Sequence, residues 1–298
     1  MVVIRSVITE DGMSKSRLVA RMVVALFVLA SGAAQAAEIF RDDFSGSTLD
    51  RTRWSVGTWT KGRTQFGKSP AISGGIATLK FDTYNAVNPG ALFTGSSITV
   101  KTPFSLGSGA ELEARVRTNA MPAGLITSFF TYGGHDTSLS DEIDFEYLTS
   151  AQSKPATANQ LSLTSWNDWD SLYPDPNNPA RRSTANVIPA GFNVSNFNVF
   201  TIRWLKDRVQ WLVNGTVVRT STNAVPNDPM SLSLNFWAPD VSWTSAYSSA
   251  LQPAATAVAG STYSYDVDYV VVRTVPEPAA VAAWAVSALL LGRRRRSP

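Results

Sequence analysis

Between residues 38 and 274 the chain is a succession of short runs rich in Val, Ile, Thr, Phe and Trp, separated by Gly, Asn, Asp and Pro. Helix-length amphipathic patterns are missing from this stretch, and many short strands with frequent turn signals are typical of an all-β sandwich or barrel. Asn214-Gly215 lies between two runs and is the strongest short signal for a hairpin. The runs that we expect to form strands are Ile76–Phe81, Ser97–Lys101, Glu111–Arg117, Ile126–Tyr132, Glu142–Leu148, Gln160–Thr164, Val199–Leu205, Val209–Val213, Thr216–Thr220, Ser231–Phe236 and Tyr265–Arg273.

This stretch has the size of one domain and shows neither a repeat nor an internal linker. Because the chain contains no cysteine, disulfides and thiolate metal sites are excluded, and a hydrophobic core must hold the domain together. Residues 150–192 contain several Pro and Asn and predict long loops on the scaffold.

The first 36 residues predict a secretory signal peptide. Basic residues Lys15, Arg17 and Arg21 precede an apolar stretch from Met22 to Ala30, and Ala34-Gln35-Ala36 matches the small-x-small cleavage pattern. The alternative, a membrane anchor, is disfavoured because the apolar run is too short to span a bilayer comfortably. We expect the protein to be exported.

Residues 275–298 predict a second sorting segment. Val275-Pro276-Glu277-Pro278 is followed by an apolar stretch from Ala279 to Leu291 and by four consecutive arginines, Arg293 to Arg296. This order resembles the PEP-CTERM tail that exosortases process in Gram-negative bacteria. It implies transient inner-membrane association through a short helix, processing by an exosortase-type enzyme, and a final location outside the cell or on its surface. A basic tail that binds nucleic acid is the alternative, but it does not account for the apolar stretch.

The charge of the chain is concentrated in these two ends. Eight of the 26 Lys and Arg and three of the 23 Asp and Glu lie there, so the body carries 18 basic and 20 acidic residues. A weakly acidic body gives no indication of nucleic-acid binding. We expect the mature protein to be a monomer that comprises residues 37–274.

The run Asp141-Glu142-Ile143-Asp144-Phe145-Glu146-Tyr147 carries the chemistry. Three carboxylates occupy every second position and apolar side chains fill the positions between, so a strand would place the carboxylates on one face. Crowded like charges on a strand are unfavourable, which indicates a functional gain. A solvated acidic outer face of an amphipathic strand is the alternative interpretation.

Eight of the nine tryptophans lie in the body. Trp204 and Trp211 are embedded in strand patterns, and we expect them in the core. Trp166, Trp169, Trp237 and Trp243 have polar neighbours, which favours exposure in a cleft. Exposed aromatic rings beside hydrogen-bonding side chains suit sugar rings.

Motifs along most of residues 40–273 resemble glycoside hydrolase family 16, in particular the bacterial lichenases. The motifs that carry this resemblance are Leu49–Trp54, Ser128–Tyr132, Asp141–Tyr147, Phe200–Trp204, Val209–Gly215, Leu234–Trp237 and Asp268–Val270. The resemblance implies a curved antiparallel β-sandwich, a concanavalin A-like jelly roll, with the substrate in a concave cleft. It also implies that Glu142 is the nucleophile, Glu146 the general acid/base and Asp144 an assisting carboxylate.

Strand geometry predicts the stereochemistry of such a reaction. Four residues of strand separate the Glu142 and Glu146 Cα atoms by about 13 Å. If both side chains lean inward, the carboxyl groups lie roughly 5–7 Å apart, near the spacing of a retaining enzyme. Family members with this unbulged spacing act mostly on glucans that contain β-1,4 linkages. We therefore expect an endo-β-glucanase; the alternatives are a transglycosylase acting on cell-surface polysaccharide and a non-catalytic carbohydrate-binding matrix protein.

Several positions depart from the lichenase pattern or match it loosely. Ser140 stands where lichenases carry a Trp, and we expect Trp166 to supply the lost stacking. Asp170–Asn186 is an insertion relative to lichenases. The other candidate substrate-binding residues are Tyr132, Gln65, Asn235, Trp237 and Trp243.

The resemblance also implies a candidate structural calcium site, although no cofactor is required for the reaction. Asp268 would supply a carboxylate, and Gly75 and Asp43 would supply carbonyl oxygens. A plain surface aspartate is the alternative, since one carboxylate does not define a hard-cation site. His135, the only histidine, is expected to be a loop residue rather than a metal ligand.

Overall fold

The computed structural model describes residues 36–134, 139–149 and 160–275. Within it, Ala37–Val275 forms one compact unit. Except for Ala36 and Val275, the predicted signal peptide and sorting segment lie outside the described residues, as does His135. Within the described ranges, no helix has the length and apolar character needed to cross a bilayer.

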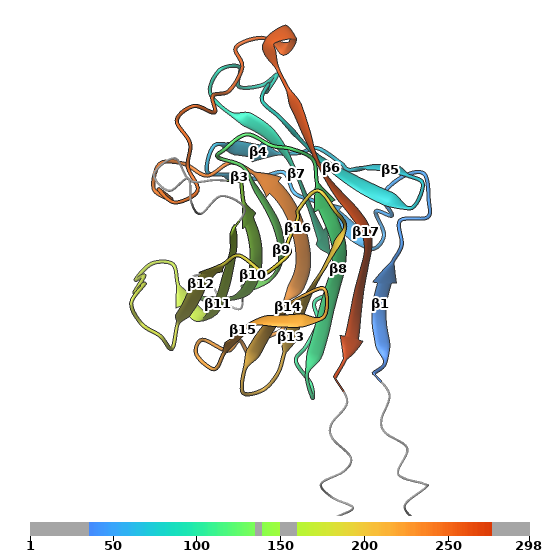
Figure 1. Cartoon of the computed structure of the whole chain (residues 1–298), viewed down its shortest axis with the longest axis vertical. Coiled ribbons are helices and arrows are strands. Elements are labelled where there is room, and N and C mark those ends of the chain that lie inside the picture. The colour runs from blue at the N-terminus through green and yellow to red at the C-terminus, as the bar shows by residue number, and fades with distance from the viewer. Residues whose placement is uncertain (1–35, 135–138, 150–159, 276–298) are drawn as a thin grey trace, which may run out of the picture. The chain divides into compact units, whose positions relative to one another are not determined.

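The unit consists of two facing β-sheets that are joined along one side into a continuous 17-stranded arrangement, and their strands bend along their length (Figure 1). The inner sheet contains, in order across the sheet, β2 (Trp54–Val56), β7 (Phe93–Val100), β16 (Ser231–Trp237), β9 (Ile126–Gly134), β10 (Leu139–Leu148), β11 (Gln160–Asp170) and β12 (Arg182–Val187). The outer sheet contains β5 (Ala71–Ser73), β6 (Ile76–Asp82), β17 (Thr262–Thr274), β8 (Ala110–Thr118), β13 (Asn198–Trp204), β14 (Val209–Val213) and β15 (Thr216–Ser221).

Three further strands complete the unit. β1 (Glu38–Asp42) pairs with the second half of β17, and β3 (Thr60–Lys61) and β4 (Thr64–Phe66) form a short hairpin. Within the described residues, β4 with β7 is the only parallel strand pairing. The 3₁₀ turn Ala257–Ala259 precedes β17. The all-β sandwich predicted from the sequence is confirmed.

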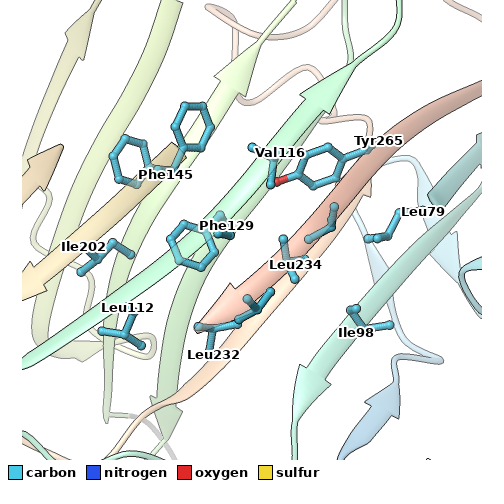
Figure 2. Packing of buried hydrophobic residues seen from close by; sticks show 14 of the residues in the cluster. Leu79, Ile98, Leu112, Val116, Phe129, Phe145, Ile202, Leu232, Leu234 and Tyr265 are labelled. Carbon is cyan, nitrogen blue, oxygen red and sulfur yellow. The ribbon is translucent and has the colours of Figure 1, made fainter. Parts of the chain in front are cut away.

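The core lies between the two sheets because each strand alternates apolar and polar side chains. Figure 2 shows Phe129, Phe145 and Leu234 of the inner sheet among Leu112 and Ile202 of the outer sheet. Phe145 also stacks on Phe200 of β13, with ring centroids 4.8 Å apart. Trp204 and Trp211 are fully buried, as predicted.

The predicted loop over residues 150–192 is wrong in part, because β11 extends to Asp170 and β12 occupies Arg182–Val187. Trp166 and Trp169 therefore lie in a strand rather than in a turn. Between them β11 contains an extra residue relative to β10, and Asp168 adopts a positive φ of 47°. The Asp168 N–H donates to Asp141 Oδ1 at 2.7 Å, which stabilises this bulge.

Candidate active site

Strand β10 positions the three carboxylates between β9 and β11. Glu142 pairs with Tyr132 and Trp166, and Glu146 pairs with Ser128 and Ser162. Both pairings run from Glu142 to Leu148 without a register shift. Since neighbouring positions of a strand face opposite sides, Glu142, Asp144 and Glu146 share the face turned away from the core.

The register arranges this polar face in rows that cross the strands. The row through Glu142 contains Ser231, Tyr132, Trp166 and Arg182; the row through Asp144 contains Thr99, Ser233, Phe130, Thr164 and Thr184; the row through Glu146 contains Ser97, Asn235, Ser128, Ser162 and Asn186. Most neighbours of the carboxylates are small hydroxyl-bearing residues, which leave the carboxyl groups as the dominant polar groups of the face.

Asp144 is held at several points. Its side chain is only 6 % exposed, and its Oδ2 accepts a hydrogen bond from the Trp166 indole Nε1–H at 3.0 Å. From the core side, Trp211 Nε1–H of the outer sheet donates to the Asp144 carbonyl oxygen at 2.9 Å. Burial, followed by the charges of Glu142 and Glu146, raises the pKa of Asp144 well above its usual value, and the Trp166 bond opposes this rise.

Glu142 and Glu146 differ in how strongly they hold a proton. Burial and then the Glu142 charge raise the pKa of Glu146 to about 8, although Lys61 and Ser128 oppose the rise. Burial also raises the pKa of Glu142, while Lys61 and a hydrogen bond with Asp144 lower it. At neutral pH, Glu146 therefore holds its proton. A protonated carboxyl group beside an ionisable one provides the two groups that acid catalysis combined with nucleophilic attack requires.

Lys61 was not among the predicted site residues. It lies on the short strand β3, and its Nζ lies 6.0 Å from the centre of the Trp237 ring. It lowers the pKa of both Glu142 and Glu146 through its positive charge. Nothing in the local sequence marks it, because the segment that carries it is remote from β10 along the chain.

Two predicted binding residues lie beside the carboxylates. Tyr132 is next to Glu142 in the same row and is 46 % exposed. Asn235 lies in the row of Glu146, with Ser128 between them, and its Oδ1 is buried without a hydrogen-bond partner among the described residues. A buried acceptor without a partner is costly, and a ligand hydroxyl would satisfy it.

The predicted exposure of Trp237 is wrong. Its side chain is 5 % exposed, its Nε1–H donates to Ser128 Oγ at 3.3 Å, and it packs with Phe66 and Leu148. Trp243, which is partly exposed, covers it with ring centroids 5.9 Å apart. Trp237 follows Asn235 by two residues, so it lies on the polar face itself, one row beyond Glu146, and is shielded from solvent there by Trp243.

The predicted placement of Gln65 in the site is also wrong. Its neighbour Phe66 packs with Trp237, so strand alternation directs Gln65 to the other side of β4. There its Oε1 accepts hydrogen bonds from Asn85 Nδ2 and Asn88 Nδ2, both at 3.0 Å.

The position of the missing lichenase Trp is filled from the neighbouring strand. Ser140 pairs with Trp169, and Trp169 packs edge-on against Trp166 with ring centroids 4.6 Å apart. Both indoles are partly exposed at the Glu142 end of the polar face. The bulge at Asp168 brings them together on the same side of β11.

The candidate calcium ligands meet where β17 changes partners. Val267 pairs with β6 and Val270 pairs with β1, so Asp268 lies in the gap between these strands. Gly75 and Asp43 flank the same gap, and a Cβ on Gly75 would lie 3.6 Å from the Asp43 carbonyl oxygen. However, Arg115 forms an ion pair with Asp268. The three residues therefore do not fit a calcium ion unless Arg115 releases the carboxylate.

A second acidic cluster, which the sequence did not reveal, lies behind the bulge. Carboxylate oxygens of Asp141, Asp168 and Asp228 all lie within 4.8 Å of one another. Asp141 is fully buried and accepts backbone N–H bonds from Asp168, Asn227 and Asp228 at 2.7–3.1 Å. Asp141 thus ties the bulge of β11 to the loop at residues 227–228 near the start of β10, which explains its place beside the carboxylate run.

Known proteins resemble this chain in sequence and in fold. A β-glucanase of Brevibacillus brevis is 32 % identical over 119 residues, which cover 38 % of this chain and 39 % of that protein, so this chain spans about two fifths of its length. The endo-1,3-1,4-β-glycanase ExoK of Rhizobium meliloti (strain 1021) is 28 % identical over 219 residues, 70 % of this chain and 72 % of that protein. The solved β-glucanase of Bacillus licheniformis superposes with a TM-score of 0.58 at 16 % identity, over 82 % of this chain and 100 % of that one.

The family model described as glycosyl hydrolases family 16 matches residues 52–255, which include strands of both sheets and the whole of β10. The match confirms the family resemblance found in the sequence motifs, and the superposition confirms the jelly-roll fold. This chain belongs to glycosyl hydrolases family 16.

Proposed function

We propose that the protein is a retaining endo-β-glucanase that cleaves a mixed-linkage or other β-1,4-containing glucan by double displacement. The observation that carries this proposal is the unshifted register from Glu142 to Glu146, with a neutral carboxyl and an ionisable one on a single strand face. Two similar proteins are named as β-glucanase and as endo-1,3-1,4-β-glycanase, which supports the glucan class.

In the first step, ionised Glu142 attacks the anomeric carbon and Glu146 donates its proton to the departing glycosidic oxygen. A covalent glycosyl-enzyme and a shortened glucan result. In the second step, Glu146 is the base: it takes a proton from water, whose oxygen then displaces Glu142 with a second inversion. The pKa of Glu146 near 8 suits both steps, because the group is protonated before attack and regains its proton afterwards.

Asp144 supports the nucleophile in this scheme. Its raised pKa keeps it protonated when Glu142 is ionised, so it donates a hydrogen bond to Glu142 and stabilises the negative charge. Tyr132, Trp166 and Asn235 surround the carboxylates and are the contacts that we assign to the sugar rings flanking the cleaved bond.

The test is hydrolysis of a substrate panel of lichenan, laminarin, xyloglucan, agarose and chitin oligomers. We expect new reducing ends from lichenan, and proton NMR of the first product should show the β-anomer. An α-anomer as first product would refute double displacement. Binding of lichenan without cleavage would refute the enzymatic function, and transfer to a labelled acceptor oligosaccharide in place of hydrolysis would identify a transglycosylase.

We also propose that the protein is exported and processed at the sorting segment, because the residues of both ends carry the corresponding patterns. Fractionation of a Gram-negative host, with mass spectrometry of the mature ends, tests this. A mature protein that begins near Ala37 and lacks Arg293–Arg296 is the expected result. An uncleaved protein in the cytoplasm would contradict it.

A further inference from the structure

The polar face contains an indole whose hydrogen bond determines how a carboxyl group is oriented. Trp166 of β11 pairs across the sheet with Glu142, but its ring reaches diagonally to the next row, where Nε1–H donates to Asp144 Oδ2 at 3.0 Å. An indole N–H is a donor only, so Oδ2 must act as an acceptor in this contact.

This constraint assigns different tasks to the two oxygens of Asp144. The carboxyl group is 6 % exposed and also shares a hydrogen bond with Glu142. Because Oδ2 accepts the indole hydrogen bond, a proton on a neutral Asp144 carboxyl group is favoured on the other oxygen, Oδ1, which is then the oxygen able to donate to Glu142. A carboxyl without such a donor would rotate, and either oxygen could hold the proton.

The indole is itself fixed from two sides. The Arg182 guanidinium lies over the Trp166 ring, 4.7 Å from its centre, and Trp169 packs edge-on against it. Arg182 opens β12 and lies in the stretch 170–186 that the lichenase pattern lacks. The insertion therefore contributes a cation that covers the indole, and the neighbouring bulge contributes the second aromatic ring.

We propose that Trp166 is a positioning residue, which sets the orientation of Asp144 and thereby the hydrogen bond that Asp144 donates to the nucleophile Glu142. The inference rests on the proposed function for its catalytic consequence, but the Trp166–Asp144 contact stands independently of it. It also explains why a tryptophan is useful here beyond sugar stacking, since stacking needs only the ring.

The charged and titratable groups around Asp144 are few. Glu142 and Glu146 flank it on β10, Lys61 faces the two glutamates from β3, and Tyr132 lies beside Glu142 on β9. Arg182 lies over Trp166, and Arg219 of β15 lies over Trp211 on the core side. The direct donor to the Asp144 side chain from a neighbouring strand is Trp166, so its removal should raise the pKa of Asp144.

The first experiment needs no substitution. In the full protein labelled with ¹⁵N-tryptophan and ¹³C-aspartate, we expect the Trp166 indole signal to shift with pH at the midpoint of the Asp144 carboxyl carbon. The Trp169 indole is the internal control and should shift far less. A Trp166 signal that is independent of the Asp144 titration would overturn the proposal.

The second experiment compares Trp166→Phe with Trp169→Phe. Trp166→Phe retains an aromatic ring but loses the N–H, and we expect the Asp144 midpoint to rise and kcat to fall about 10-fold, with KM changed less than about 3-fold. Trp169→Phe should leave the Asp144 midpoint in place. Arg182→Gln should lower kcat by a smaller factor than Trp166→Phe.

The outcomes separate the proposal from its alternatives. If Trp166→Phe raises KM alone and leaves kcat and the Asp144 titration unchanged, Trp166 is a sugar-stacking residue only and the proposal fails. If the wild-type protein cleaves no glucan, the proposed function fails. The Asp144 titrations in the wild type and in Trp166→Phe still decide whether Trp166 positions Asp144.

Discussion

The carboxylates of the outer sheet and the three carboxylates of β10 on the inner sheet lie in opposite electrostatic environments. On the outer sheet, Arg117 pairs with Asp266 at 3.0 Å and Arg203 pairs with Glu111 at 2.9 Å. On the inner sheet, Glu142, Asp144 and Glu146 form no ion pair among the described residues. The outer carboxylates lie beside cations at the surface, whereas the inner ones are crowded together with one lysine acting at a longer distance.

The paired outer carboxylates and the crowded inner ones differ in their effect on the stability of the fold. A paired surface carboxylate contributes a little to stability, typically below about 1 kcal/mol. A buried carboxyl with a raised pKa is destabilising once it is ionised, because burial and like charges disfavour the ionised form. Substituting a carboxylate of the outer sheet should therefore lower the stability of the fold only slightly and leave the site unchanged. Substituting one of the three carboxylates of the inner sheet should abolish the proposed activity and increase the stability of the fold.

The largest expected effect follows from removing Glu142. Glu142→Ala should lower glucan hydrolysis by at least about 10,000-fold, because the proposed nucleophile is lost. Azide should partly restore cleavage by entering the vacated space, and the product should be a glycosyl azide of inverted anomeric configuration. The matched control, Glu111→Gln on the outer sheet, should stay within about two-fold of wild type. Equal losses in both variants would contradict the division between the sheets.

The next effect depends on the leaving group. Glu146→Ala removes the proposed proton donor, so hydrolysis of lichenan, the expected substrate, should fall by about 100- to 10,000-fold. An aryl glycoside with an acidic phenol as leaving group needs little protonation, and formation of its glycosyl-enzyme should fall far less, which a stopped-flow measurement of the phenol burst would show. The same loss on both substrates would mean that Glu146 is not the acid.

How much of this site was accessible from the sequence depends on how far apart the interacting residues lie. The alternation of Glu142, Asp144 and Glu146 is local, so the strand period alone placed them correctly on one face. The bulge at Asp168 depends on the Asp141 side chain, which lies 27 residues earlier. No local pattern indicates such a contact, and the Pro and Asn content of residues 150–192 predicts a loop there instead.

The binding residues show the same limit. Trp237 has polar neighbours in sequence, but it is covered by Trp243 and supported by Phe66, which come from other segments. Gln65 was assigned to the site by resemblance, yet Asn85 and Asn88 occupy its amide oxygen on the other side of β4. Lys61 influences both glutamates from a two-residue strand that no periodic pattern could reveal.

A smaller effect concerns stability and its dependence on pH. The folded state raises the pKa of Glu146 from 4.5 to about 8, so it binds the proton more tightly than the unfolded chain does. This contribution to stability is complete below about pH 4.5 and is lost as the pH rises toward 8. Glu146→Gln should therefore increase the free energy of unfolding at pH 9 by on the order of 2 kcal/mol relative to wild type, and by much less at pH 5.

Chemical denaturation at both pH values measures this difference, and Glu111→Gln is again the control. Because Glu111 is paired with Arg203, its substitution should be neutral or mildly destabilising at both pH values. A Glu146→Gln variant that is less stable than wild type at pH 9 would show that the carboxylates of the inner sheet are not in electrostatic conflict.

The smallest effect concerns an outer-sheet carboxylate that is deprived of its ion-pair partner, as the three carboxylates of the inner sheet are. Arg115→Gln removes the ion-pair partner of Asp268 and frees its carboxylate at the gap that Gly75 and Asp43 flank. Carboxylate and carbonyl oxygens are the ligands that calcium prefers. Without calcium, the variant should lose less than about 1 kcal/mol. Calcium at millimolar concentration should then raise its Tm more than that of wild type, in which the cation must first displace Arg115.

Arg117→Gln, which frees Asp266 away from this gap, is the control and should show no such gain in Tm. Thermal unfolding in calcium and in chelator measures the effect in all three proteins. If wild type and Arg115→Gln respond equally to calcium, Arg115 does not compete for the site and the ion pair of the outer sheet is incidental.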